Sequence, residues 1–244
     1  MANSAPITLQ QLFKFYRGLP HQSAALVTLE EDIVANGYAV AMRRDREWFT
    51  AWSQDGKQPD PPKPEQTAIK LNVPWFSQND NATGMGYREC FSSSCAMLAI
   101  FNGKKVLSDD AYNQIRAKFG DSTDAQAQLR ALRSLGLLAD FRTDGTPELL
   151  KQELTAGRPV AVGWLHKGPI TAPSGGGHWT VVTGWQPQPR AWVMNDPNGE
   201  ANLLNGGYVS HRNGAGRIYS EANWNRRWMV EGVGTGWMLT CKQK

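Results

Sequence analysis

The spacing of apolar residues changes along the chain from a helical period to a β pattern. In the first fifth, apolar positions recur at helical spacing and stop at glycine signals, which predicts three helices within 8–53. Further on, a continuous apolar run starts at Cys90 and stops at Asn102-Gly103, which predicts a buried helix. Three more capped helices are expected, beginning near Ser108, Thr123 and Pro147.

Short β-prone runs follow these helices in the second half of the chain. They predict strands at 159–165, 179–185, 192–195 and 236–241. Helices that come first and an antiparallel sheet that comes later are the layout of an α+β domain. The predicted fold class is therefore α+β, with helices packed on an antiparallel sheet.

A polar, proline-rich segment at 55–65 separates two parts of the chain and is typical of a semi-rigid linker. The predicted organisation is a small helical module at 1–54, a linker at 55–67 and a larger domain at 68–244. Two interpretations of the module stay open. Trp48 and Trp52 either pack its helices together, which requires no ligand, or stack on sugar rings in a targeting or wall-binding role.

Cys90 lies where a turn meets the predicted buried helix. The Gly84-Met85-Gly86 stretch before it is incompatible with regular structure, so the thiol falls in the first helical turn. There the helix dipole and the unpaired N–H groups favour a thiolate, and the same groups can hold an oxyanion. A buried structural cysteine is the alternative for this residue taken alone.

A glycine run delivers His178 to the start of a β-prone stretch, and Asp196 ends the next short strand. If the two strands pair as a hairpin through the loop 186–189, His178 and Asp196 come to the same end of the sheet. An imidazole beside a carboxylate is held in one tautomer and can take a proton from a thiol. Gln78, twelve residues before Cys90, is a candidate amide donor for an oxyanion hole, although a surface glutamine without a role is the commoner case.

These motifs resemble the papain-fold cysteine peptidases of the bacteriocin-processing type, over about residues 70 to 240. The resemblance implies a papain-like fold with Gln78 in the oxyanion hole, Cys90 as nucleophile, His178 as general base and Asp196 as orienting acid. The chain departs from many relatives at Phe91-Ser92, where they have Gly-Pro. It is also similar to peptidase-like domains of bacteriophage lysins. The residues that match the bacteriocin-processing peptidases are Val73-Pro74-x-x-Ser77-Gln78, Cys90 with Ala96-Met97, Gly177-His178-x-x-Val181-Val182-x-Gly184 and Asn195-Asp196-Pro197. The residues that match the lysin domains are Cys90 to Met97 and Arg226-Arg227-Trp228-Met229.

Composition fits a globular enzyme, with 244 residues of which 41% are hydrophobic. The net charge of +4 gives a mild attraction to anionic surfaces, and the interspersed charges argue against nucleic acid as a partner. No apolar stretch approaches the length of a membrane span, and no signal peptide is evident. We therefore expect synthesis in the cytoplasm without membrane insertion. The resemblance to phage lysins implies a bacterial host and release to the cell wall through a partner pore.

Three cysteines, an odd number, fit neither a disulfide framework nor a zinc motif. Cys95 is predicted to fill the core, and the state of Cys241 stays open. No metal and no organic cofactor is expected. The candidate substrate contacts are Trp179, His166 and Phe91.

Alternative interpretations apply to some of these positions. If His166 does not contact substrate, it is a loop histidine with satisfied hydrogen bonds. If Trp179 does not contact substrate, it is a core residue. The segment 223–229, with Arg226 and Arg227, is either a wall of the cleft or an exposed charged turn.

By its resemblance to phage lysins, the chain is predicted to be a thiol-dependent peptidoglycan hydrolase, an endolysin-like endopeptidase that cleaves peptide bonds of the bacterial cell wall. Its partner is therefore bacterial peptidoglycan or another peptide substrate. One alternative is a cytosolic cysteine peptidase that processes a leader or another polypeptide. Another is a non-catalytic, peptidase-like binding module, although such a module would have little use for the complete set of four site residues.

Overall fold

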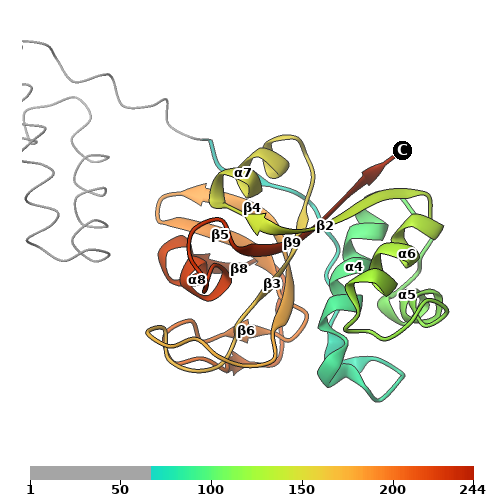
Figure 1. Ribbon diagram of the computed structural model, residues 1–244, viewed down its shortest axis with the longest axis horizontal. Helices are drawn as coiled ribbons and strands as arrows, with labels where there is room; N and C mark the ends of the chain where they lie inside the picture. The colour runs from blue at the N-terminus through green and yellow to red at the C-terminus, as the bar shows by residue number, and fades with distance from the viewer. Residues whose placement is uncertain (1–66) are drawn as a thin grey trace, which may run out of the picture. The chain divides into compact units, whose positions relative to one another are not determined.

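The computed structural model describes residues 67–244, in which helices cover both faces of a seven-stranded sheet (Figure 1). The helical module predicted at 1–54 lies outside the described residues, as does nearly all of the linker predicted at 55–67. The boundaries assigned to those two parts stay predictions.

The main sheet is antiparallel throughout, as the sequence predicts. Its strand order is β2-β9-β3-β4-β5-β8, and β1 pairs with β4. The last strand of the chain, β9, thus lies inside the sheet, and β6 and β7 form a separate pair. The strands are β1 (Ile69–Lys70), β2 (Leu137–Gly145), β3 (Val160–Trp164), β4 (His178–Pro187), β5 (Arg190–Asn195), β6 (Glu200–Ala201), β7 (Tyr208–Ser210), β8 (Arg217–Ser220) and β9 (Gly236–Gln243).

Three helices, α4 (Cys90–Phe101), α5 (Asp109–Arg116) and α6 (Ala125–Ser134), form a layer against one face of the sheet (Figure 1). The side chains of α4 are buried almost all round, because this helix lies between the sheet and its two helical neighbours. Met97 and Leu98 of α4 share one core with Leu132 of α6 and with Val181 and Leu239 of the sheet.

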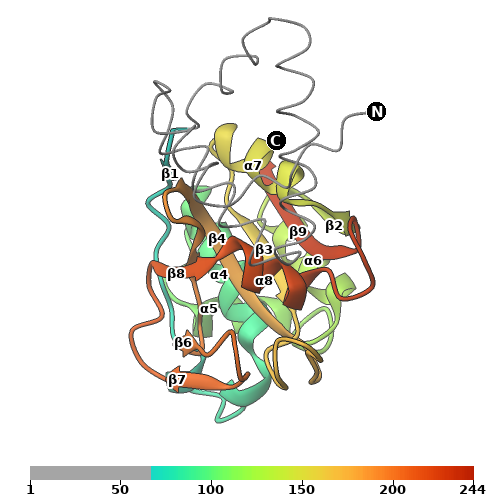
Figure 2. The same ribbon diagram turned by 90° about the vertical axis from the view of Figure 1, so that its left-hand side faces the viewer.

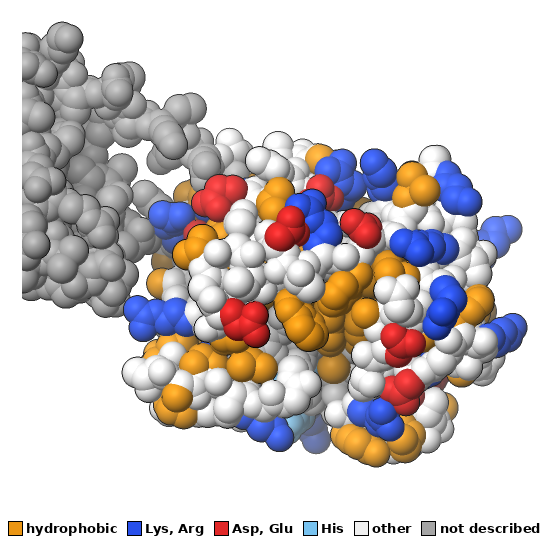
Figure 3. Space-filling view, in the orientation of Figure 1, with side chains coloured by type: hydrophobic (Ala, Val, Ile, Leu, Met, Phe, Trp, Pro, Cys, Tyr) orange, Lys and Arg blue, Asp and Glu red, His pale blue; other side chains and the backbone are white. Residues whose placement is uncertain are grey.

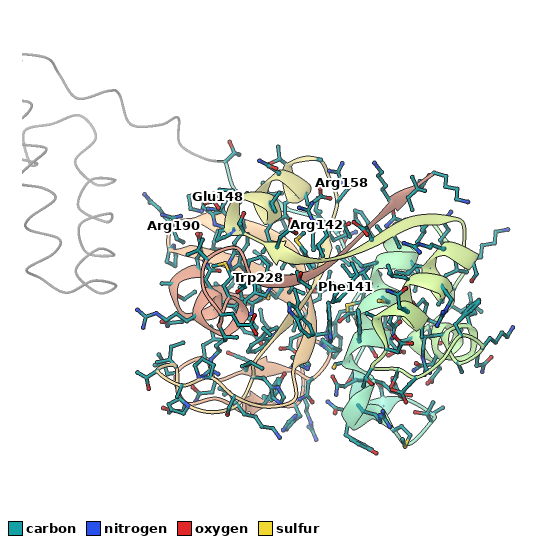
Figure 4. All side chains as sticks on the ribbon, in the orientation of Figure 1. Phe141, Arg142, Glu148, Arg158, Arg190 and Trp228 are labelled. Atoms are coloured by element: carbon teal, nitrogen blue, oxygen red, sulfur yellow. The ribbon has the colours of Figure 1, made fainter. Side chains whose placement is uncertain are left out.

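The other face of the sheet carries α7 (Pro147–Thr155) and α8 (Glu221–Trp228) over a second core that is rich in tryptophan. Trp224 and Trp228 of α8 stack with ring centroids 5.1 Å apart. The indole Nε1 of Trp228 donates to the carbonyl of Trp237 at 2.9 Å, which fixes the end of α8 to β9, where Figure 4 labels Trp228. Aromatic side chains of this size bury large apolar areas, so α8 is packed firmly against the sheet.

Two of the three predicted helix starts after α4 are confirmed, and the third is corrected. The helices α5 and α7 begin after Ser108 and at Pro147. The cap of α6 is Asp124, not Thr123, because the Asp124 carboxylate accepts a backbone N–H two residues on at 2.8 Å. The Thr123 hydroxyl instead donates to Asp121 at 2.7 Å.

The strands predicted at 159–165, 179–185, 192–195 and 236–241 correspond to β3, β4, β5 and β9, so the α+β fold with an antiparallel sheet is confirmed. The strand β2 and the helix α8 were not predicted. In β2, buried Leu137 and Ala139 alternate with exposed Leu138 and Asp140, which is the pattern of a strand with one buried face. The segment 223–229, interpreted as a cleft wall or a charged turn, belongs mostly to α8.

The start of α4, the start of β4 and the end of β5 lie at one end of the sheet, together with the β6–β7 pair (Figures 1 and 2). This end gathers the predicted site residues from segments far apart in the chain. The short 3-10 helices η1 (Gln78–Asp80) and η2 (Gly86–Arg88) complete it from the segment that precedes α4.

Candidate active site

Cys90 is the first residue of α4 and is partly exposed, as its place after a turn predicts. The turn is fixed by the buried Glu89 carboxylate, which accepts hydrogen bonds at 2.7 Å from Asn81 Nδ2 and from the Thr83 hydroxyl. These bonds hold the chain before Cys90 in one path. The thiol therefore occupies a fixed position at the positive end of the helix dipole.

The β4–β5 hairpin brings His178 and Asp196 together, as predicted. Val181 pairs with Asn195 in the ladder, and His178 Nε2 lies 2.7 Å from Asp196 Oδ1. Both side chains are buried, His178 being 3% exposed and Asp196 0%. Cys90 is a further hydrogen-bond partner of His178.

The surroundings of His178 favour its protonated form. Burial by itself lowers the pKa of the imidazole, but the Asp196 carboxylate and then Cys90 outweigh this effect and raise that pKa to about 10. The Asp196 bond at Nε2 leaves Nδ1 as the nitrogen for Cys90. The site is thus suited to hold an imidazolium beside Cys90.

Two tyrosines that were not predicted as site residues also hold Asp196. The Tyr219 hydroxyl donates to Asp196 Oδ2 at 2.9 Å, and the Tyr208 hydroxyl lies 3.4 Å from both carboxylate oxygens. The backbone N–H of Asn198 donates to Oδ1 at 2.9 Å. Tyr208 and Tyr219 come from β7 and β8, short strands without a sequence signal long enough to place them beside β5.

Gln78 is buried at the start of η1, between the segment that follows Asp196 and the turn that precedes Cys90. Its backbone N–H donates to Pro197 at 2.9 Å, and its side-chain Nε2 donates to Gly86 at 2.8 Å. This bond uses one of the two amide hydrogens and leaves the second for another acceptor. Gly86 lies so close to the Gln78 carbonyl that a Cβ at this position would collide with it.

His166 lies beside His178 in the segment after β3, with ring centroids 5.4 Å apart. Its ring also packs against Trp164 and Tyr208, at centroid distances of 6.5 and 6.0 Å. Burial and then the nearby charge of His178 lower the pKa of His166 to about 4. The two neighbouring imidazoles therefore have opposite protonation states at neutral pH.

The remaining candidate substrate contacts form a row of aromatic rings next to His178. Phe91 and Trp179 stack with centroids 3.6 Å apart, and Phe141 lies 5.9 Å from both Trp179 and Trp237. We name Phe91, Trp179, Phe141 and Trp237 the aromatic row. Figure 3 shows apolar side chains gathered in a furrow between the sheet and the α4–α6 layer, where Figure 4 places Phe141.

The members of the aromatic row differ in exposure. Trp237 is 51% exposed and Trp179 is partly exposed, whereas Phe91 is 1% exposed. The prediction that Phe91 contacts substrate does not fit this position, because a ring buried in the core has no surface to offer. Phe91 instead stacks face to face against the Trp179 indole.

A separate hollow of about 520 Å³ lies between β2, β9 and α7. Its lining includes Arg133, Arg158 and Lys242, and Figure 4 shows Arg158 at the α7 end of the molecule. None of the predicted site residues belongs to this lining. We therefore place the reaction at the end of the sheet where Cys90 and His178 meet, and regard the hollow as a feature of the basic surface.

Other sequence expectations concern cysteines and metals. Cys95 and Cys241 are buried, and all three cysteines are free. Within residues 67–244, no group of three or more His, Cys, Asp and Glu side chains is arranged to hold a metal ion. No helix of this part of the chain has the length and apolarity that crossing a membrane requires.

A cysteine at the start of a helix, facing a histidine and an aspartate on an antiparallel sheet, defines a papain-like cysteine peptidase. The family model described as "Peptidase_C39 like family" matches residues 70–225, and the chain belongs to this family. It is therefore a cysteine peptidase, a hydrolase, of the papain-like fold class that includes the bacteriocin-processing type.

Comparison with solved structures gives the following similarities. A C39-like peptidase from Bacillus anthracis is 14% identical, with a TM-score of 0.52 over 73% of this chain and 100% of that one. A double glycine motif protease from an AMS/PCAT transporter, in complex with the leader peptide, is 22% identical, with a TM-score of 0.46 over 73% and 100%. The peptidase domain of Streptococcus ComA is 19% identical, with a TM-score of 0.45 over 72% and 99%. No curated protein matches the chain.

Proposed function

We propose that this peptidase hydrolyses peptide bonds of bacterial peptidoglycan through a Cys90 thiolate. The arrangement of Cys90, His178 and Asp196 carries the proposal, because it unites a nucleophile, a base and an orienting acid in one hydrogen-bonded set. The thiolate attacks the scissile carbonyl, and the carbonyl oxygen becomes an oxyanion. His178 gives its proton to the leaving amine, and the acyl-enzyme forms.

The second half of the reaction uses the same groups in reverse. Neutral His178 takes a proton from water, and the resulting hydroxide attacks the thioester carbonyl. The thiolate leaves, the carboxylate product forms and the His178 imidazolium is restored. Asp196 keeps the ring oriented throughout, since its carboxylate holds Nε2.

Gln78 is the proposed side-chain donor to the oxyanion, together with the Cys90 backbone N–H. The Gln78 Nε2 bond to Gly86 fixes the amide plane and leaves one hydrogen free to bind the oxyanion. The buried position of Gln78 supports this role, because a fixed donor needs no reorganisation when charge develops. Trp179 and His166 are the proposed substrate contacts beside His178.

The proposal of a cell-wall substrate is supported by the charge of the peptidase domain. Residues 67–244 carry 19 Lys and Arg against 14 Asp and Glu, a net charge of +5. Figure 3 shows basic side chains spread along one side of the domain, over the α4–α6 layer and the end of β9. Such a surface favours association with an anionic polymer such as the bacterial wall. Synthesis in a bacterial host and release through a partner pore belong to the same proposal.

A second candidate function is the processing of a leader or another polypeptide. The aromatic row favours it, because the half-exposed Trp237 and the partly exposed Trp179, both in contact with Phe141, suit apolar side chains of an extended chain.

Digestion of purified peptidoglycan by the wild type and by Cys90→Ala, read by mass spectrometry, tests the proposal. New amine and carboxyl ends from the wild type alone are expected. A panel of unfolded polypeptides runs in parallel, and cleavage of these with an unchanged wall would replace the first candidate by the second. Binding to walls without new ends in either assay would leave only a non-catalytic binding module.

A further inference from the structure

Arg227, in the last turn of α8, is 0% exposed. Within residues 67–244, every hydrogen bond of its guanidinium goes to a backbone carbonyl. Nε donates to Leu203 at 2.7 Å, Nη1 donates to Leu165 and Lys167 at 3.1 Å, and Nη2 donates to Gly168 at 2.8 Å. Burial of a cation is costly unless its donors are satisfied, and the planar five-donor fork of arginine can satisfy several carbonyls at fixed angles.

The carbonyls that Arg227 binds belong to two segments that lead to the active site. We name 165–168 the first segment and 203–207 the second segment. The first segment leads to His178 at the start of β4, and the second connects the Asp196 end of the site to Tyr208. A backbone bond from Gly207 N–H to the His166 carbonyl at 2.7 Å also joins them.

The backbone of His166 is consequently fixed on both sides and at its own carbonyl. The Arg227 guanidinium donates to the carbonyls of Leu165 and Lys167, which flank His166. The Gly207 N–H donates to the carbonyl of His166 itself. This backbone and the packing of the ring against Trp164 and Tyr208 together place the imidazole 5.4 Å from the His178 ring. Its Nδ1 is buried without a hydrogen-bond partner among the described residues, so the ring proton is better placed on Nε2.

We propose that Arg227 is a positioning residue, which holds the first segment against the second and thereby fixes His166 as a second imidazole of the active site. The role of His166 is to donate a hydrogen bond from Nε2 to the substrate, while His178 takes the proton of the thiol and gives it to the leaving amine. The inference rests on the proposed function, because it assigns His166 to the substrate that Cys90 attacks.

Anchoring of α8 alone does not account for the Arg227 bonds. Trp224 and Trp228 already fix the helix in the second core, and Glu221 fixes its other end by accepting from Trp185 Nε1 at 2.7 Å. The guanidinium adds contacts to the two segments only. A second arginine, Arg226, precedes it in the sequence but is exposed, which provides a control of equal charge in the same helix.

The test uses the full chain with Arg227→Lys, Arg227→Gln and the control Arg226→Gln. Circular dichroism and thermal melting first establish which variants fold. NMR titration of the His166 ring then reports its environment, and the rate of Cys90 alkylation by iodoacetamide between pH 4 and 10 reports the thiolate–imidazolium pair. Peptide mapping confirms that Cys90 is the thiol that reacts.

For Arg227→Gln we expect the His166 pKa to rise from about 4 toward its ordinary value, because the released segment exposes the ring. We expect kcat/KM to fall about 10- to 100-fold on the best substrate found, mainly through KM, since displacements of about 1 Å cost this much. Arg227→Lys should be intermediate, because one ammonium group cannot bridge three carbonyls of the first segment. Arg226→Gln should behave as the wild type.

The proposal is overturned if a folded Arg227→Lys or Arg227→Gln keeps the His166 titration and KM of Arg226→Gln and loses only thermal stability. It is also overturned if His166→Phe leaves KM unchanged. If Arg227→Gln does not fold, Arg227→Lys decides by the same two readouts. Failure of the proposed function is visible separately and does not depend on the Arg227 variants: the wild type would then leave peptidoglycan unchanged in the digestion assay. If His178→Ala left the alkylation rate of Cys90 unchanged, the Cys90–His178 pair itself would be refuted.

Discussion

The segments that carry His178 and His166 meet in the active site but are held by different means. His178 is held through its side chain, by the Asp196 carboxylate at 2.7 Å, and its pKa is raised to about 10. His166 is held through its backbone, by Arg227 and Gly207, and its pKa is lowered to about 4. The site therefore keeps one imidazolium beside Cys90 and not two.

This difference shows that the partner of each ring decides its chemistry, and residue type alone does not. A carboxylate at hydrogen-bond distance outweighs the burial of His178, whereas His166 has burial without such a partner. An imidazole that stays neutral can donate one hydrogen bond without adding charge. We infer that the two rings serve different steps, proton transfer for His178 and substrate contact for His166.

The largest expected effect comes from removal of the His178 imidazole, the ring that is held by the Asp196 carboxylate. His178→Ala should lower kcat/KM by about 10⁴-fold or more, because loss of the base also removes the cation that stabilises the thiolate. His211→Gln is the histidine control, because His211 is exposed and reaches Asp196 only indirectly, through Tyr208, on which its ring stacks at 5.1 Å, and Asn198, so the rate should fall several-fold at most. Kinetics on the substrate found by the digestion assay measure both, and equal activity of the two variants would refute the assignment of His178.

Replacement of the carboxylate tests what sets the protonation of His178. In Asp196→Asn we expect the His178 pKa to fall well below 10, because the carboxylate is the strongest of the influences that raise it. The rate should fall about 10²- to 10⁴-fold, since an amide favours the wrong tautomer or orientation of the ring. NMR titration of His178 with parallel kinetics checks this, and an unchanged pKa would show that Asp196 does not control the ring.

The two tyrosines offer a finer comparison on the same carboxylate. Tyr219→Phe should cost about 1–2 kcal/mol of stability and a several-fold loss of rate, because a buried acceptor loses a short bond of 2.9 Å. Tyr208→Phe should cost less, since its hydroxyl lies 3.4 Å from each oxygen. Urea unfolding and kcat measure both effects. A larger loss in Tyr208→Phe would mean that the distance from each hydroxyl to the Asp196 carboxylate does not determine which tyrosine contributes more.

The sequence was sufficient to predict the parts of the site that local patterns define. Cys90 after a turn, and His178 and Asp196 at the ends of one hairpin, follow from helix signals, strand signals and a short loop. Tyr208 and Tyr219 could not be predicted in this way, because β7 and β8 are short and their place depends on non-local pairing.

Arg227 shows a second limit of sequence reasoning. A charged residue in a short stretch is typical of an exposed turn, yet here its neighbours Trp224 and Trp228 draw the same helix face into the core. The spacing of these two tryptophans, four residues apart, was the available signal for α8. The carbonyls that accept from Arg227 come from segments about 20 to 60 residues away, and no local pattern identifies them.

The smallest expected effect is a change in how stability depends on pH. Between pH 6.5 and 4 the unfolded chain binds a proton at His166 that the folded protein excludes, so folding stability falls as the pH is lowered through this window. His178 acts in the opposite direction. The folded protein retains its proton up to about pH 10, so the stability it contributes is full below pH 6.5 and is lost as the pH rises toward 10.

His166→Phe separates these two contributions. The variant should lose the acid-side decline, worth about 1–2 kcal/mol after allowance for solvent screening, and keep the alkaline one. Urea unfolding at pH 4.5, 6.5 and 9 measures the free energy of unfolding in each window, with His211→Gln as a histidine control. The same slope between pH 4.5 and 6.5 in both variants would mean that His166 is not kept neutral by the fold. A loss of the slope in His166→Phe alone would show that the backbone-held ring is folded without its proton, as a neutral donor to the substrate requires.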